Sequence, residues 1–98
     1  MKLEQYNTYK IVATFKDENG QVVSATNVKI YVVQYDGTTV IDGEDMSSVE
    51  NNYVYFLDTS QLPKLGKYYL RIEGYISGRK VSNTEVFTLV RCVEEVTD

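Results

Sequence analysis

The sequence of 98 residues contains no histidine and no tryptophan, and it has only one proline and one cysteine. Without histidine, the Ser-His and Cys-His pairs that activate most nucleophiles are excluded, and no Ser-Lys pair stands out. With a single cysteine, Cys92, a disulfide within the chain is impossible. We interpret Cys92 as a small, half-buried hydrophobe rather than a reactive or intermolecular thiol. We therefore expect no enzyme activity, no catalytic residue and no cofactor.

Positive charge is also scarce. Ten lysines and arginines stand against fourteen acids, which gives a net charge of −4, and they form no basic block. Because phosphate contacts dominate nucleic-acid binding, the composition argues against a nucleic-acid partner. No apolar run reaches transmembrane length, and the N-terminus lacks the apolar stretch of a signal peptide. We expect no membrane partner and a protein that is made and kept in the cytoplasm.

Alternation of apolar and polar residues is the dominant pattern. Apolar side chains recur at every second position of residues 9–15, which is typical of a strand with one buried face. No long stretch has the period of a helix, and residues 42–52 form a polar loop. The strands predicted in this way cover residues 9–15, 28–35, 38–41, 53–57, 67–76 and 81–90.

These segments, separated by turn residues, predict one all-β domain over residues 1–98 with a frayed tail from about residue 93. The expected architecture is an antiparallel β-sandwich of about seven strands. Its core is predicted from the apolar register of the strands, and six side chains should be almost fully buried: Phe15, Ile30, Val32, Leu70, Ile72 and Phe87.

Several segments resemble bacterial and phage immunoglobulin-like domains. Residues 11–23 (IVATFKDENGQVV) are similar to their B strand and the turn after it, residues 28–37 to their C strand, and residues 87–90 to their G strand. Residues 62–68 (LPKLGKY) look like their tyrosine corner. The resemblance implies an immunoglobulin-like sandwich in which the Tyr68 hydroxyl bonds to the backbone of residues 58–65.

Nine tyrosines in 98 residues are more than a core needs. In immunoglobulin-like topology strands C, F and G share a sheet, and alternation then places one group of side chains on its outer face. Tyrosine and arginine dominate interface energetics, so we predict an interaction surface there, with ordinary cross-strand packing as the alternative. The predicted surface consists of Tyr31, Val33, Tyr35, Tyr69, Arg71 and Tyr75.

The acidic residues lie mostly in predicted turns, where solvated carboxylates are ordinary. We therefore predict no metal site. The alternative is a calcium ion held by Asp42, Glu44 and Asp45, because carboxylate oxygens suit hard cations, although the spacing is not that of an EF-hand loop.

The resemblance implies a non-enzymatic structural or interaction protein. The chain is short and lacks a signal peptide. Among proteins with such domains, these features favour a phage virion component, such as a head-decoration, neck or tail-associated subunit assembled in the host cytoplasm. Such a subunit would act by oligomerisation and by docking onto itself or other virion proteins. The alternative is an adhesin-type or carbohydrate-binding module excised from a larger exported protein.

Overall fold

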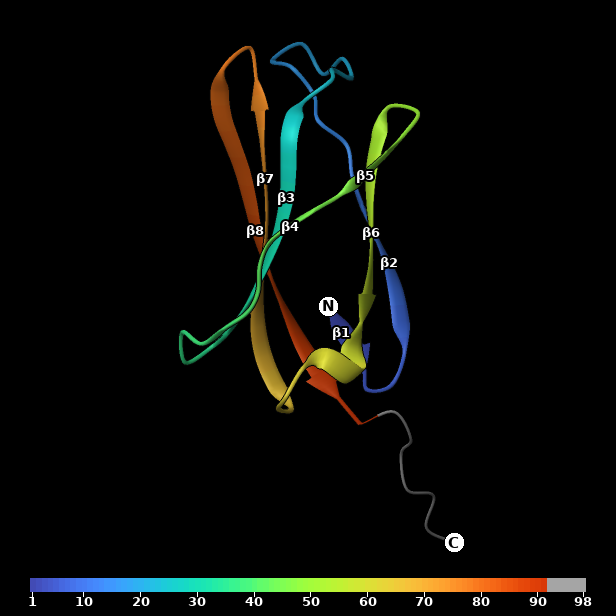
Figure 1. Ribbon diagram of the computed structural model, residues 1–98, viewed down its shortest axis with the longest axis vertical. Coiled ribbons are helices and arrows are strands. Elements are labelled where there is room, and N and C mark those ends of the chain that lie inside the picture. The colour runs from blue at the N-terminus through green and yellow to red at the C-terminus, as the bar shows by residue number, and fades with distance from the viewer. Residues whose placement is uncertain (92–98) are drawn as a thin grey trace, which may run out of the picture.

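The computed structural model describes residues 1–91, which form two β-sheets packed face to face (Figure 1). One sheet has five strands in the order β1-β8-β7-β3-β4, and the other has three in the order β2-β6-β5. Helical structure in this part of the chain is limited to the three-residue 3-10 helix η1 (Thr59–Gln61). The all-β sandwich is therefore confirmed. Its strands are β1 (Lys2–Glu4), β2 (Thr8–Ala13), β3 (Thr26–Gln34), β4 (Thr39–Asp45), β5 (Ser47–Val49), β6 (Asn52–Asp58), β7 (Gly66–Ile76) and β8 (Arg79–Val90).

The centre of the larger sheet is β7. It pairs with β8 as a long antiparallel hairpin, from Gly66 opposite Leu89 to Ile76 opposite Arg79. On its other side it pairs antiparallel with β3, so that Ile30 lies opposite Ile72. The prediction that the strands corresponding to C, F and G share one sheet is confirmed.

The core lies between the sheets and follows the alternation of the strands. In β3 the side chains of Val28, Ile30 and Val32 are buried. Leu70 and Phe87 are buried on the neighbouring strands, and the Phe87 ring stacks on Tyr68 with centroids 5.2 Å apart. Four of the six predicted core residues are thus confirmed: Ile30, Val32, Leu70 and Phe87.

The other two predicted core residues, Phe15 and Ile72, are only partly buried. Both line an open side of the sandwich between β2 and β8, where no further strand of the described chain covers them. The prediction was wrong for these residues because alternation identifies the inward face of a strand but not whether a second layer reaches it.

The polar loop predicted for residues 42–52 is also wrong. β4 continues to Asp45 along β3, and after the buried Met46 the chain joins the opposite sheet as β5 (Figure 1). The Met46 amide donates to the carbonyl of Val28 at 3.0 Å, which ties the crossing to β3. Edge strands tolerate charged residues because one side faces water. The acidic residues of β4 therefore made it look like a loop in the sequence.

A short N-terminal strand escaped prediction as well. β1 runs parallel to the end of β8, with Leu3 opposite Leu89. Leu3 is buried, whereas Lys2 and Glu4 are exposed. Three residues are too few to show an alternating pattern in the sequence. The strand is held in place by its pairing with β8.

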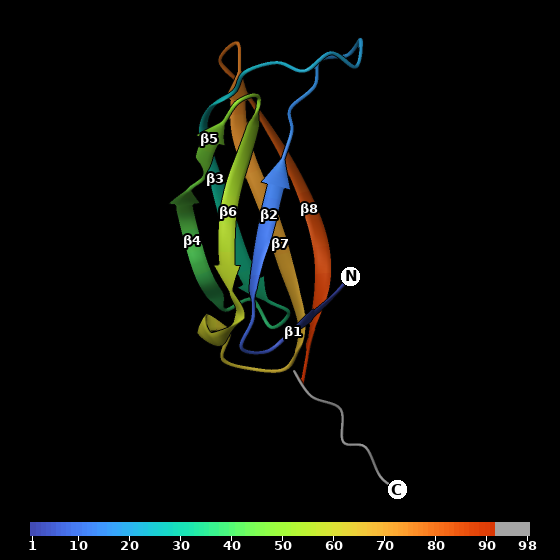
Figure 2. The same ribbon diagram turned by 90° about the vertical axis from the view of Figure 1, so that its right-hand side faces the viewer.

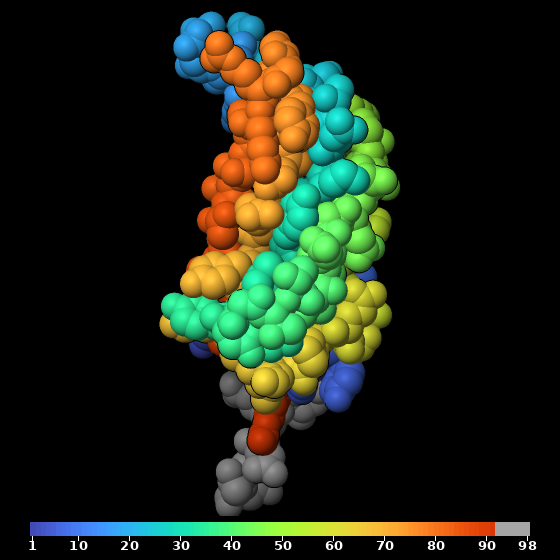
Figure 3. Space-filling view, turned by 60° about the vertical axis from the view of Figure 1, so that its left-hand side comes forward, coloured from blue at the N-terminus to red at the C-terminus, as the bar shows by residue number. Residues whose placement is uncertain are grey.

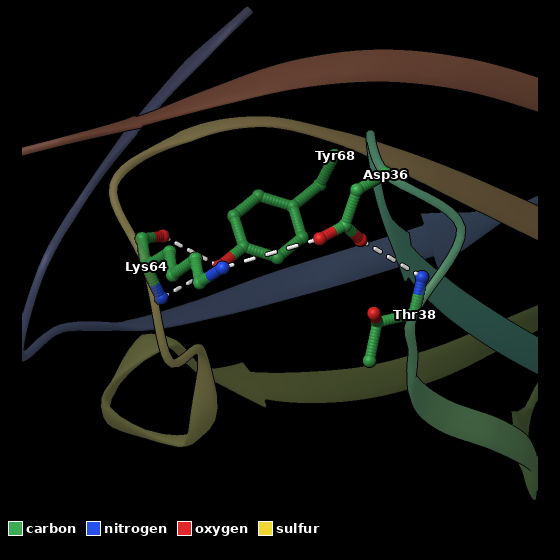
Figure 4. Close-up of polar contacts among 4 residues, drawn as sticks. All are labelled: Asp36, Thr38, Lys64 and Tyr68. Atoms are coloured by element: carbon green, nitrogen blue, oxygen red, sulfur yellow. Dashed lines mark hydrogen bonds and ion pairs between the residues drawn. The ribbon is translucent and has the colours of Figure 1, made fainter.

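Two tyrosine hydroxyls each form hydrogen bonds with both the amide and the carbonyl of one backbone residue. The Tyr68 hydroxyl donates to the Lys64 carbonyl and accepts from the Lys64 amide at 3.1 Å (Figure 4). In the same way, the Tyr53 hydroxyl donates to the Ala25 carbonyl at 2.8 Å and accepts from the Ala25 amide at 2.9 Å. Tyr68 is buried, so the predicted corner, with its bond to the segment 58–65, is confirmed.

The turn from β3 to β4 lies against this corner (Figure 4). The Thr38 amide donates to the Asp36 carboxylate at 3.0 Å, and the Lys64 ammonium lies 4.0 Å from the other carboxylate oxygen. The hydrogen bond from Thr38, assisted by Lys64, holds the pKa of Asp36 below its usual value. The turn therefore favours the charged form of Asp36.

Replacing Phe87 with alanine should lower the free energy of unfolding by about 3–5 kcal/mol, because it empties a fully enclosed site. Chemical denaturation measures the loss, and Phe56→Ala is the matched control because Phe56 is 63% exposed. Equal losses in the two variants would show that Phe87 is not a core anchor.

Tyr68→Phe should cost about 1–2 kcal/mol, because it leaves both the amide and the carbonyl of Lys64 without their partner. Tyr6→Phe, at a tyrosine that is 72% exposed, should change stability little. Thermal unfolding of both variants tests this, and a neutral Tyr68→Phe would contradict a stabilising corner.

Candidate protein interface

The predicted surface residues lie together on the outer face of the five-stranded sheet. Tyr31 is opposite Arg71 in the β3–β7 ladder, and Val33 is opposite Tyr69. Tyr75 lies further along β7, and Tyr35 directly follows β3. We call this set (Tyr31, Val33, Tyr35, Tyr69, Arg71 and Tyr75) the outer tyrosine face. Figure 3 shows this side of the molecule, where β8, β7, β3 and β4 lie side by side.

Aromatic and cationic side chains of this face are stacked on one another. The rings of Tyr35 and Tyr69 are nearly parallel, with an interplanar angle of 14° and centroids 5.2 Å apart. The Lys67 ammonium lies 5.5 Å from the Tyr35 ring centre, and the Arg71 guanidinium lies 4.5 Å from that of Tyr31. Both distances are in the range of cation–π attraction, so the side chains hold one another in place.

The proximity of the stacked tyrosines also affects their ionisation. The neighbouring Tyr35 hydroxyl raises the pKa of Tyr69 above its ordinary value. Tyr35 is 56% exposed and Tyr69 37%, so both rings still face solvent.

A buried carboxylate fixes the arginine of the face. Glu73 is only 8% exposed although it points outward. Its carboxylate lies 2.9 Å from Nε of Arg71 and 3.3 Å from Nζ of Lys80. Arg71 is held by this ion pair and by Tyr31 at the same time, and such double restraint lowers the entropy that binding would cost.

Three members of this arrangement were not predicted: Lys67, Glu73 and Lys80. The alternation of β7 could have found the first two, because residues 67, 69, 71, 73 and 75 all share the outer register. Charged residues on a wet sheet face are ordinary, however, and nothing in the sequence shows that Glu73 is covered by its neighbours.

Gly43 on β4 makes room for Tyr31. A Cβ added to this glycine would lie 3.1 Å from two atoms of the Tyr31 side chain, and the glycine has a φ of +76°. The left-handed backbone and the close ring both favour glycine here. The edge strand thereby supports the outer tyrosine face from the side.

The three acids considered for calcium do not converge on a common point. Asp45 pairs with Lys29 at 2.7 Å. Glu44 lies beside Tyr55, where burial and then this carboxylate raise the pKa of the Tyr55 hydroxyl. Asp42 is exposed opposite Tyr31. In the part of the chain that the structure describes, no three acidic or cysteine side chains are grouped to hold a metal ion.

Within residues 1–91 no helix is long and apolar enough to cross a membrane. Cys92 and the tail predicted from about residue 93 lie outside the described residues.

Comparisons with known proteins place the fold. No protein-family model matches the sequence, and no curated protein matches it. Among solved structures, the chain is similar to the filamin domain of Lin-41, with 25% sequence identity and a TM-score of 0.64. The match covers 92% of this chain and 83% of that chain. Since a filamin domain is immunoglobulin-like, this likeness and the two packed sheets establish an immunoglobulin-like β-sandwich. Membership of a bacterial or phage family stays a prediction.

The support that Gly43 gives to Tyr31 can be measured against Gly78, which has the same φ of +76° but nothing within 4 Å of an added Cβ. Gly78→Ala should cost about 1–2 kcal/mol from backbone strain alone. Gly43→Ala should cost more, because the Tyr31 ring must also move. Denaturation of both variants compares the losses, and equal losses would contradict the supporting role of Gly43.

Proposed function

We propose that this chain is a protein-interaction module that docks onto another protein, or onto a second copy of itself, through the outer tyrosine face. The observation that carries the proposal is the exposed stack of Tyr35 on Tyr69, with Arg71 held over Tyr31. The similarity to a filamin domain supports an interaction module in general terms.

The chemistry of the face suits protein recognition. Tyrosine and arginine are enriched among the residues that dominate binding energy. A tyrosine ring offers a large apolar area together with a hydroxyl that can hydrogen-bond. Because the ion pair with Glu73 and the ring contacts already restrain these side chains, a partner would lose little free energy in ordering them.

Within this class we propose the role expected from the sequence, a phage virion subunit of the head-decoration, neck or tail-associated type. Its support is the resemblance of residues 11–23 and 62–68 to immunoglobulin-like domains of that group. Assembly would then take place in the host cytoplasm, and the outer tyrosine face would be the contact between neighbouring subunits.

The double variant Tyr31→Ser, Tyr69→Ser tests the face directly. Both side chains point away from the core, so the protein should still fold, with a modest loss of melting temperature from the lost ring contacts. Truncating a hot-spot tyrosine costs about 2 kcal/mol or more of binding free energy, so removing two should weaken assembly on the order of 1,000-fold. Sedimentation velocity over a concentration series measures self-association, and incorporation into particles measures docking to virion proteins.

The matched control is Tyr6→Ser, Phe56→Ser, because these two aromatics are 72% and 63% exposed elsewhere on the molecule. This control should assemble like the unchanged protein. Unchanged assembly of the Tyr31, Tyr69 variant would refute the face and point to pairing of strand edges, in which the backbone supplies the affinity. Specific binding of an oligosaccharide on this face would instead support the carbohydrate-binding alternative and overturn the proposal.

A further inference from the structure

A groove of about 490 Å³ runs between β2 and β8, on the side of the sandwich away from β4 and β5. In Figure 2, β2 lies in front with β7 and β8 behind it and to its right. The groove is apolar at its floor, where partly buried side chains meet across the two sheets: Ile11, Ala13, Phe15, Ile72, Ile76 and Val81. It is separate from the outer tyrosine face, which lies on the opposite surface of β7.

The groove is bordered by backbone as well as by side chains. Seven consecutive residues, from Lys10 on β2 to Lys16 just beyond its end, line the groove, so the edge of this segment faces it. Just after β2, the Phe15 carbonyl and the Asp17 amide bond to residues 21–23 of the following turn. β2 is an edge strand whose one ladder in the described chain is with β6. An edge of this kind presents amide and carbonyl groups that can pair with an added strand.

The far side of the groove already accepts a strand at one end. β1 pairs with β8 in parallel, but it covers only Thr88 to Val90. The Met1 carbonyl accepts from the Thr88 amide at 3.0 Å, and Met1 itself lines the groove. Beyond that point the edge of β8, from Arg79 to Phe87, has no strand of residues 1–91 beside it.

The charges along β2 and the three residues that follow it indicate what kind of strand would fit. Lys10, Val12, Thr14 and Lys16 point outward on the β2 side of the groove and are exposed. In the described chain neither lysine forms an ion pair, and Lys10 lies opposite Phe56. The one acid of the lining, Glu85, is on the β8 side.

We propose that this groove binds an extended acidic segment of a partner protein by strand addition to β2. Alternate residues of the segment would place apolar side chains on the floor formed by Ala13, Phe15 and Ile72. The residues between them would be aspartate or glutamate, which lie beside Lys10 and Lys16 as cross-strand neighbours. Opposite charges in that position stabilise pairing and like charges oppose it, so the lysines select the segment.

The test uses the whole 98-residue chain and two capped heptapeptides as probes. One peptide alternates glutamate with valine, and the other alternates lysine with valine. In an amide NMR titration, the glutamate peptide should shift the signals of residues 10–16 and 81–85. It should bind at least about tenfold more tightly than the lysine peptide, given the contribution of two cross-strand charge pairs.

The variant Lys10→Glu, Lys16→Glu should reverse the preference between the two peptides. Both lysines are exposed, so the variant should keep its fold. Lys64→Glu, Arg91→Glu makes the same change in net charge away from the groove and should leave the preference unchanged.

Three results would overturn this proposal. The first is equal affinity for both peptides, and the second is shifts confined to the outer tyrosine face. The third is broadening of residues 10–16 with protein concentration before any peptide is added, which would assign the groove to a second copy. Because the Tyr31, Tyr69 variant leaves the groove intact, the failure of one surface does not decide the other.

Discussion

The strict alternation of side chains along β7 is the constraint on which the rest of the structure depends. β7 pairs with strands on both sides, which fixes its register. Its side chains then alternate between the two faces of the sheet: residues 68 and 70 face the second sheet, and the odd-numbered residues face away. The inward set supplies Tyr68 and Leu70 to the core. The outward set supplies Tyr69, Arg71 and Glu73 to the exposed face. Shifting the pairing of β7 by one residue would exchange the two sets, so the register that buries the core also builds the outer tyrosine face.

The same reasoning explains what the sequence could predict. Period two identified the long strands, the burial of Ile30 and Phe87, and the grouping of Tyr31 with Arg71. The tyrosine corner followed from residues 62–68 because a local motif determines that contact. The sequence could not predict β4 to its full length or β1 at all. An acidic edge strand and a three-residue strand carry no alternation of their own. β4 is defined by its pairing with the preceding strand β3, and β1 by its pairing with β8 at the other end of the chain.

Phe15 and Ile72 show a different limit. Both face inward, as their registers require, yet neither is fully covered, because β2 and β8 do not meet. Sequence periodicity describes one strand at a time, whereas burial depends on whether the two sheets close against each other. For the candidate interface the limit is similar. Alternation placed its tyrosines on one face, but the ion pairs that cover Glu73 and the contact of Tyr31 with Gly43 involve four strands together.

The central claim is that the outer tyrosine face is covered when the protein assembles. Tyrosine nitration followed by mass spectrometry tests it most directly, because it compares each ring in the isolated chain and in the assembled state. Tyr35, Tyr69 and Tyr75 are exposed in the isolated chain and should become protected on assembly, while Tyr6, at 72% exposure, should react equally in both. Unchanged reactivity of Tyr35 and Tyr69 in the assembled state, or protection confined to Tyr6, would contradict the account.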